Sequence, residues 1–304
     1  MHAHIALAER WPHFGDAGAL RMRRDAGQGE GDMRAGAAER LYGEIYLGCI
    51  RTLVAGARDP GDLGNLGNLD DEILLGTIRT LVGGQRKLRV LDIGCQSGRL
   101  AIPLARDGHR VTALDIDDDW LRRCQRNARA EGVDLRLLHR PLHEAAQALP
   151  GERFDLVICT ELLYVLREPV RALQVLAGLL EPGGTLLTSH RTRHYMLLTL
   201  ARYRRWDDMA LVVQGEEGHI LGGQYYNWFE LDTLHAQYSQ AGLRIESALG
   251  VGVFSGMGVD GLAAVLDPGC VPASDHPRLL DIERACSALY PDAARYRLLV
   301  AKLA

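Results

Sequence analysis

Two acids and two glycines, spaced along one stretch of the chain, are the residues best placed to do chemistry. Asp92 and Gly94 lie at the end of an apolar run, Gly98 follows, and Asp115 ends a second apolar run. Glycine lets a backbone approach a ligand closely because it has no Cβ. An acid at the end of the next strand, roughly twenty residues on, can accept hydrogen bonds from ribose hydroxyls. The stretch predicts a site for a nucleoside-type ligand.

The glycine pattern of this loop and the acid before it indicate which nucleoside-type ligand binds. Residues 94–100 read GCQSGRL, which is not the G-x-G-x-x-G pattern of a dinucleotide site, and Gln96 replaces a middle glycine. We expect Gln96 to hold a negative φ, because a side chain makes positive φ unfavourable by about 1 kcal/mol. Asp92 would repel a pyrophosphate but suits a cationic ligand. A ligand with an ammonium and a sulfonium, S-adenosylmethionine, fits this description.

Alternating strands and helices must position this loop. Strands are expected at 89–94, 110–116, 133–139, 153–160 and 184–190, with helices between them, the last one stopped by Pro182-Gly183-Gly184. Asp117, Asp118 and Asp119 are expected to cap the helix that follows them. Such alternation indicates right-handed βαβ units and a parallel sheet, whose ligands bind beyond the carboxyl ends of the strands.

The rest of the chain shows a looser pattern. Helices are expected at 38–54 and from Asp70 or Asp71 to Val82, the second ended by Gly83-Gly84. After His190 we expect an inserted helical piece at 193–214, a hairpin at 218–229, a helix at 230–242, a strand at 243–254, a helix at 276–290 and a final edge strand at 295–304.

Composition excludes several classes of protein. The net charge of -4 disfavours a dedicated nucleic-acid binder, and we find no apolar run of the roughly 18 residues that cross a membrane. The first residues lack the pattern of a signal peptide. The six cysteines are scattered without a C-x-x-C pair, which predicts reduced thiols, no metal site and a cytoplasmic protein.

Four segments, in this order and spacing, resemble the class I S-adenosylmethionine-dependent methyltransferase family: VLDIGCQSGRL, VTALDID, RFDLVICTELLYVL and LLEPGGTLL. The resemblance covers roughly residues 89–190. It implies an α/β fold with a doubly wound, Rossmann-like, seven-stranded, mostly parallel sheet and one antiparallel strand, for which RYRLLVAKL is the candidate. It also implies S-adenosyl-L-methionine as cofactor and S-adenosyl-L-homocysteine as product.

On this basis the chain divides into four parts. Residues 1–84 would form a flexible lead-in and an N-terminal helical cap, and residues 85–190 the cofactor-binding core. Residues 191–228 would be a lid insertion over the substrate, and residues 229–304 would complete the sheet.

The resemblance also assigns cofactor contacts. It implies that the loop Asp92–Gly98, with Cys95 and Gln96, cradles the methionine part, that Asp115 holds the ribose and that Ile116 packs on adenine. The backbone at Thr160 and Glu161 would line the methionine and the transferring methyl group. The sequence departs from the family where Arg140-Pro141-Leu142 replaces a Gly-Asp-Ala, so only the Leu142 N–H remains there, and where Tyr164-Val165-Leu166 replaces a Glu-His-Val.

Three residues are candidates for acid–base work on the acceptor. His190 ends the fifth strand, and a histidine of ordinary pKa can remove a proton near neutral pH. A structural, hydrogen-bonded histidine at a strand end is an equal alternative. His194 and Glu161 are the other two candidates.

Arginines and aromatics follow His190, in HRTRHY and ARYRRW. Arg191 or Arg193 would bind a carboxylate or phosphate of the acceptor, with Tyr164, Tyr226 and Trp228 lining its site. A nucleic-acid surface and a plain solvated helix are the alternatives.

These observations predict methyl transfer to a small molecule, on oxygen or nitrogen rather than carbon, and the arginines favour an anionic acceptor. An RNA or protein methyltransferase, or a non-catalytic methyltransferase-like partner subunit, is the alternative. The oligomeric state is left open.

Overall fold

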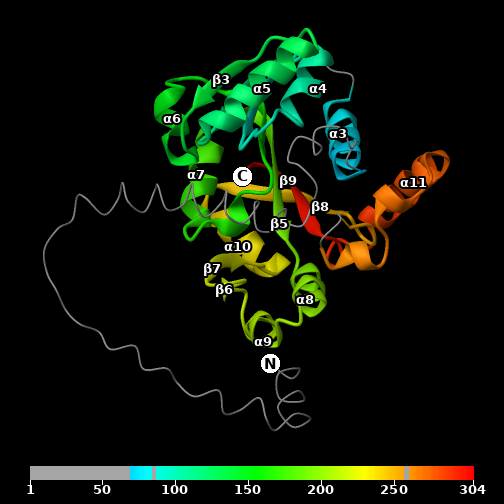
Figure 1. Ribbon diagram of the computed structural model, residues 1–304. Helices are drawn as coiled ribbons and strands as arrows, with labels where there is room; N and C mark the ends of the chain where they lie inside the picture. The colour runs from blue at the N-terminus through cyan, green and yellow to red at the C-terminus, as the bar shows by residue number, and fades with distance from the viewer. Residues whose placement is uncertain (1–68, 84–86, 257–259) are drawn as a thin grey trace, which may run out of the picture. The chain divides into compact units, whose positions relative to one another are not determined.

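The computed structural model describes residues 69–83, 87–256 and 260–304 (Figure 1). The helix expected at 38–54 and most of the expected lead-in and cap lie outside these residues. Within the described part of the chain, every helix is too short or too polar to cross a membrane.

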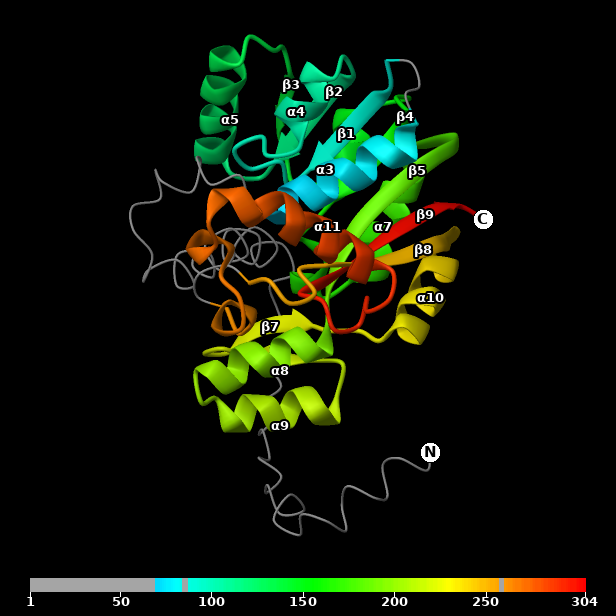
Figure 2. The ribbon, with the colours of Figure 1, turned by 90° about the vertical axis from the view of Figure 1, so that its right-hand side faces the viewer.

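The centre of the fold is a seven-stranded sheet in the order β3-β2-β1-β4-β5-β9-β8 (Figures 1 and 2). Its strands are β1 (Arg89–Ile93), β2 (Arg110–Asp115), β3 (Arg136–His139), β4 (Phe154–Cys159), β5 (Leu180–Arg191), β8 (Leu243–Val251) and β9 (Tyr296–Leu303). Only β9 runs antiparallel to its neighbours in this sheet. The prediction of one antiparallel strand at the end of the chain is confirmed.

The prediction that this last strand lies at an edge is wrong. β9 is inserted between β5 and β8, and Tyr296 to Ala301 are all buried. The run RLLVA is apolar almost throughout, as expected for a strand covered on both faces rather than one that alternates toward solvent.

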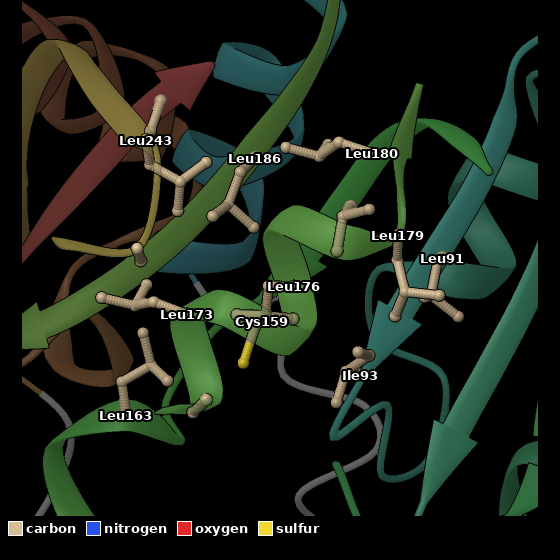
Figure 3. Packing of buried hydrophobic residues seen from close by; sticks show 14 of the residues in the cluster. Leu91, Ile93, Cys159, Leu163, Leu173, Leu176, Leu179, Leu180, Leu186 and Leu243 are labelled. Carbon is tan, nitrogen blue, oxygen red and sulfur yellow. The ribbon is translucent and has the colours of Figure 1, made fainter. Parts of the chain in front are cut away.

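Helices cover both faces of the sheet (Figure 2). They are α3 (Leu69–Val82), α4 (Ala101–Arg106), α5 (Asp118–Ala130), α6 (Ala145–Ala148), α7 (Pro169–Gly178), α10 (Leu231–Gln240) and α11 (His276–Ser287). One buried cluster joins the sheet to α7 and α10 and contains Leu91, Leu173, Leu186 and Tyr238 (Figure 3 shows part of it). The second joins the sheet to α3, α4 and α11 and contains Val90, Leu104 and Leu187. Neighbouring residues of one strand therefore belong to opposite faces.

Local sequence explains several element ends. The Asp117 side chain accepts hydrogen bonds from the N–H groups of Asp119 and Trp120 and so caps α5, as predicted. α3 ends at Val82, and Gly83 follows with φ +55°. α3 begins at Leu69, so Asp70 and Asp71 lie inside its first turn instead of capping it from outside.

The Pro-Gly-Gly segment was expected to stop a helix, but it belongs to a strand. α7 ends at Gly178 and β5 begins at Leu180. The pairing with β4 jumps from Phe154–Leu180 to Leu156–Thr185, so Pro182, Gly183 and Gly184 form a bulge. A Cβ on Gly184 would lie 2.9 Å from the Phe154 carbonyl oxygen, which explains the glycine at this close approach.

Residues 191–228 form a separate layer beyond the carboxyl end of β5 (Figures 1 and 2). It consists of α8 (Arg193–Arg202), α9 (Trp206–Gln214) and the hairpin of β6 (Glu217–Ile220) and β7 (Gln224–Asn227). The expected single helical piece is thus two helices, broken where Arg204 adopts φ +54°. The two helices and the hairpin share a buried cluster, which also includes Tyr164 from the segment after β4. This contact attaches the layer to the carboxyl edge of the sheet.

Candidate active site

The candidate residues gather at the carboxyl edge of the sheet, on the face covered by α3 and α4. Leu91 and Ile93 belong to the opposite core, so the alternation of β1 turns Asp92 toward this face. The same alternation places Asp115 beside Ala113 on β2, and Ser189 and Arg191 beside Leu187 on β5. Three parallel strands thus bring polar side chains to one edge.

The loop between β1 and α4 turns through left-handed backbone. Gly94 and Gly98 have φ +78° and +90°, and the N–H groups of Gly94 and Cys95 both donate to the Leu114 carbonyl, at 2.8 and 3.2 Å. Gln96 has φ +48°, so the expectation of a negative φ is wrong. Its N–H donates to Asp115 Oδ2 at 2.8 Å, and this bond to a buried carboxylate offsets the unfavourable dihedral.

Gly98 is required by packing as well as by φ. A Cβ there would lie 2.7 Å from Ile102 Cδ1 and 2.8 Å from Cys124 Sγ. We expect Gly98→Ala to lower the free energy of unfolding by about 2–3 kcal/mol, measured by urea denaturation. Gly108→Ala is the matched control, because Gly108 has φ +94° but nothing within 4 Å of its Cβ position. Equal losses for the two variants would show that the packing around Gly98 is not tight.

Asp92 is a buried acid. Its side chain accepts a hydrogen bond from the N–H of Ala101 at the start of α4. Burial raises the pKa of Asp92 to about 7; the Arg99 charge lowers it, and the nearby Asp115 charge raises it. A positive ligand placed here would relieve an unfavourable buried charge.

Asp115 ties the loop to β2. Besides the Gln96 N–H, it accepts the N–H of Asp117 through Oδ1 at 2.9 Å, and burial raises its pKa. A carboxylate offers about four lone-pair positions, so it can accept further hydrogen bonds from a ligand. The next residue, Ile116, is 40% exposed, which leaves an apolar surface beside this carboxylate.

Other expected cofactor contacts surround this pair. Cys95 is buried in the loop and contacts Cys124 of α5. Thr160 is buried directly after β4. Leu142 begins a short 3-10 helix after β3 and is partly buried against the core.

A compact polar cluster lies at the ends of β4 and β5. The Glu161 carboxylate forms an ion pair with Arg191 and accepts a 3.0 Å hydrogen bond from the Ser189 hydroxyl. The Tyr164 hydroxyl lies 3.5 Å from Glu161 Oε2 and 3.4 Å from Arg191 Nη2. This is the part of the predicted acceptor site that the structure brings together.

Tyrosines enclose the Arg191 guanidinium. Its carbon lies 4.9 Å from the ring centre of Tyr164, 4.8 Å from that of Tyr195 and 5.9 Å from that of Tyr296. Burial disfavours the cation, but the Glu161 charge and the interactions with Tyr164 and Tyr195 together outweigh it and keep the pKa of Arg191 well above its ordinary value. Tyr226 stacks on Tyr164, with the ring centres 6.1 Å apart.

Comparison with known proteins agrees with this geometry. Residues 90–184 match the family model described as a methyltransferase domain. This part of the chain is a methyltransferase domain. Such domains use S-adenosylmethionine as their cofactor.

Several curated proteins similar to this chain carry the same name. The ubiquinone biosynthesis O-methyltransferase of Serratia proteamaculans is 32% identical over 130 residues, which are 43% of this chain and 54% of that protein. The enzyme of the same name from Xanthomonas euvesicatoria is 29% identical over 163 residues, which are 54% and 65% of the two chains. The chain spans little more than half the length of most such relatives.

Solved structures extend the likeness of the fold beyond the methyltransferase domain. Magnesium protoporphyrin IX methyltransferase from Synechocystis, with bound S-adenosylhomocysteine, covers 88% of this chain and 99% of its own with a TM-score of 0.54 at 14% identity. The Burkholderia thailandensis 1,6-didemethyltoxoflavin-N1-methyltransferase covers 92% and 93% with a TM-score of 0.51 at 17% identity. At these identities the likeness concerns the fold.

His190 is misplaced for the role of base that was expected of it. It is 1% exposed on the α10 side of the sheet, where Nε2 hydrogen-bonds to the Tyr238 hydroxyl at 2.9 Å. Burial, and next the Arg297 charge, lowers its pKa to about 3, so it is a weak base at neutral pH. The structural alternative is the better description. His194 is exposed on α8.

Two of the residues expected at the acceptor serve the framework of the 191–228 layer. Trp228 is fully buried and donates its indole N–H to the Gly215 carbonyl at 2.7 Å. Arg193 pairs with Glu230 and donates to the carbonyls of Val212 and Val213 at the end of α9. Neither side chain is placed to bind an acceptor.

The sequence analysis missed Ser189, Tyr195 and Tyr296. Ser189 could have been found, because it stands two residues before Arg191 and so shares its face of β5. Tyr296 carries no such signal: it reaches Arg191 because β9 pairs with β5, Arg191 opposite Tyr296.

Proposed function

We propose that this protein is an S-adenosylmethionine-dependent methyltransferase that methylates oxygen or nitrogen of a small molecule. One observation carries the cofactor assignment: a buried carboxylate, Asp92, stands next to a left-handed glycine loop whose Gln96 N–H is fixed by Asp115. A buried acid with a raised pKa is matched by a cationic ligand, and the acid on β2 is matched by a ribose.

The proposed roles follow from the placement of the residues. The bound cofactor supplies a methyl group activated by a sulfonium. Asp92 would hold the ammonium end, Asp115 would accept the ribose hydroxyls, and Ile116 would pack on the base. Transfer is an in-line displacement, which depends chiefly on the orientation of the two reactants. The backbone after β4 and the Glu161 cluster stand on the acceptor side.

The small-molecule acceptor is supported by the layer of residues 191–228, which follows β5 beyond the carboxyl edge. The names of the relatives support oxygen as the atom methylated. An anionic acceptor loses support, because Arg191 and Arg193 already have partners within the protein. The free thiols in the described part of the chain support a cytoplasmic location.

Calorimetry with S-adenosylhomocysteine tests the cofactor, and turnover of S-adenosylmethionine with a panel of phenols, alcohols and amines tests the acceptor. We expect binding in the micromolar range and methylation of at least one panel member. Binding without turnover on any small molecule, but with turnover on RNA that falls steeply with salt, would favour the RNA alternative. Absence of binding would favour a non-catalytic subunit and contradict the proposal.

Asp115→Ala should weaken binding of S-adenosylhomocysteine 10- to 100-fold, which corresponds to about 1–3 kcal/mol for buried hydrogen-bonding groups left without partners. Asp117→Ala is the control: it removes the cap of α5 beside the site, so it should lower stability by about 1 kcal/mol without changing affinity. An unchanged affinity in Asp115→Ala would refute the ribose role.

A further inference from the structure

Glu161 adopts an unfavourable backbone conformation at the centre of the carboxyl edge. It follows β4, which lies between β1 and β5, and has φ +59°. A long side chain in left-handed backbone costs about 1 kcal/mol and persists only where its surroundings hold it.

Ser189 holds this residue by two hydrogen bonds. The Glu161 N–H donates to Ser189 Oγ at 2.6 Å, and the Ser189 hydroxyl donates to Glu161 Oε1 at 3.0 Å. Ser189 is fully buried, so water does not compete for either bond. One hydroxyl thus satisfies both the backbone and the side chain of Glu161.

The first of these bonds orients a peptide group. In a planar trans peptide the carbonyl and the N–H point in opposite directions. Because the Glu161 N–H points to Ser189 on β5, the Thr160 carbonyl is turned away from β5, toward the side of β4 on which β1 lies. That is the side of Asp92 and the glycine loop.

The side chain of Glu161 is held independently. Arg191 pairs with Oε2, and both side chains are largely buried, at 14% and 17% exposure. The guanidinium is in turn fixed between the rings of Tyr164 and Tyr195. Rotation of the Glu161 backbone would have to break both the Ser189 bonds and this ion pair.

We propose that Ser189 is a positioning residue for the cofactor: by holding Glu161 in left-handed backbone, it turns the Thr160 carbonyl toward the bound methionine end. This inference rests on the proposed function. It assigns Arg191 to the same task, in place of binding an acceptor anion. Ser189 itself need not touch the cofactor.

Calorimetry with S-adenosylhomocysteine tests this without knowledge of the acceptor. We expect Ser189→Ala to weaken binding about tenfold, because the unfavourable φ is no longer compensated and the binding-competent conformer becomes a minor one. Ser287→Ala is the control: Ser287 also donates a buried hydroxyl, to the Gly250 carbonyl at 2.6 Å, but Gly250 lies on β8, with β9 between it and the strand of Ser189. It should lower the melting temperature while leaving the affinity unchanged.

A double-mutant cycle separates positioning from general stability. Glycine has no penalty at positive φ and has no carboxylate for Ser189 to bond, so in the Glu161→Gly background only the bond to the backbone N–H is left to lose, and Ser189→Ala should weaken binding clearly less than tenfold. If that background is poorly folded, Glu161→Asn replaces it, because asparagine tolerates left-handed backbone. The same tenfold loss in both backgrounds, or no loss in Ser189→Ala alone, would overturn the inference. Failure of the unmodified protein to bind would instead overturn the proposed function.

Discussion

Asp92→Asn should make the unliganded protein more stable at pH 8 and at the same time remove most of its cofactor affinity. The carboxylate of Asp92 is almost completely buried, and burial raises its pKa to about 7. At pH 8 the folded protein therefore carries a buried charge that the unfolded chain keeps in water. Asparagine retains an oxygen that can accept the Ala101 N–H, but it carries no charge.

The sign of the effect follows from proton linkage. The folded-state pKa lies above the unfolded value of about 3.9, so the folded state binds more protons between these two values. The destabilisation by Asp92 is absent below about pH 4, grows as the pH rises toward 7, and is complete above it. We expect Asp92→Asn to raise the free energy of unfolding by about 2–4 kcal/mol at pH 8 and by much less at pH 5.

Cofactor binding should show the opposite dependence. The ammonium group of the ligand pairs with the ionised form of Asp92, so affinity for S-adenosylhomocysteine should fall by up to tenfold per pH unit below 7. Among the facing groups, Arg99 stays charged, and the raised pKa values of Cys95 and Cys159 keep both thiols neutral. Asp115 also faces Asp92: its charge raises the pKa of Asp92, and burial raises the pKa of Asp115 itself. The ligand's own amine has a pKa above this range, so it stays protonated.

Urea denaturation at pH 5 and 8 and calorimetry between pH 5.5 and 7 measure the two effects. Asp134→Asn is the control, because Asp134 is exposed and lies away from the loop. Asp92→Asn should bind at least tenfold more weakly at pH 7 and lose the pH dependence of binding. A variant that is less stable than the unmodified protein at pH 8 would show that the Asp92 charge is compensated within the fold.

The sheet and its loop were predictable because they depend on local signals. Apolar runs separated by glycine-ended helices located the strands up to β5, and the acids that end β1 and β2 located the proposed cofactor site. Asp117 was recognised as a cap for the same reason. Each of these features is determined by residues close together in the sequence.

Features that depend on tertiary contacts were not predictable. The positive φ of Gln96 is compensated by Asp115, which reaches it from the neighbouring strand. The inner position of β9 follows from its pairing with β5, and the Pro-Gly-Gly bulge follows from the approach of the β4 backbone. Local propensity argued for a different result at all three places.

The residues expected on the acceptor side show most clearly what the sequence pattern does not predict. His190 and Arg191 are adjacent on one strand, so only one of them can face the carboxyl-edge cluster. Sequence pattern assigned a role there to both. The structure turns Arg191 toward Glu161 and His190 toward Tyr238, and the choice is set by which core each face of β5 joins.

Arg191→Met should be among the most destabilising substitutions in the described part of the chain. It leaves the Glu161 carboxylate, at 17% exposure, without its charged partner and removes the contacts with three tyrosine rings. Breaking a buried ion pair from one side typically costs about 3–5 kcal/mol, because the remaining charge is left uncompensated. Urea denaturation at pH 7 measures the loss.

Two further variants show whether the pair acts as a unit. Glu161→Gln in the Arg191→Met background removes the orphaned charge and should recover at least half of the loss. Arg136→Met is the matched control: Arg136 bonds both oxygens of Glu152 at 2.8 and 2.9 Å, but both side chains are exposed, so its loss should stay below about 1 kcal/mol. If Arg191→Met lowers the free energy of unfolding no more than this control does, the ion pair between the guanidinium and Glu161 does not stabilise the fold. In that case the guanidinium would be available to an anionic acceptor after all.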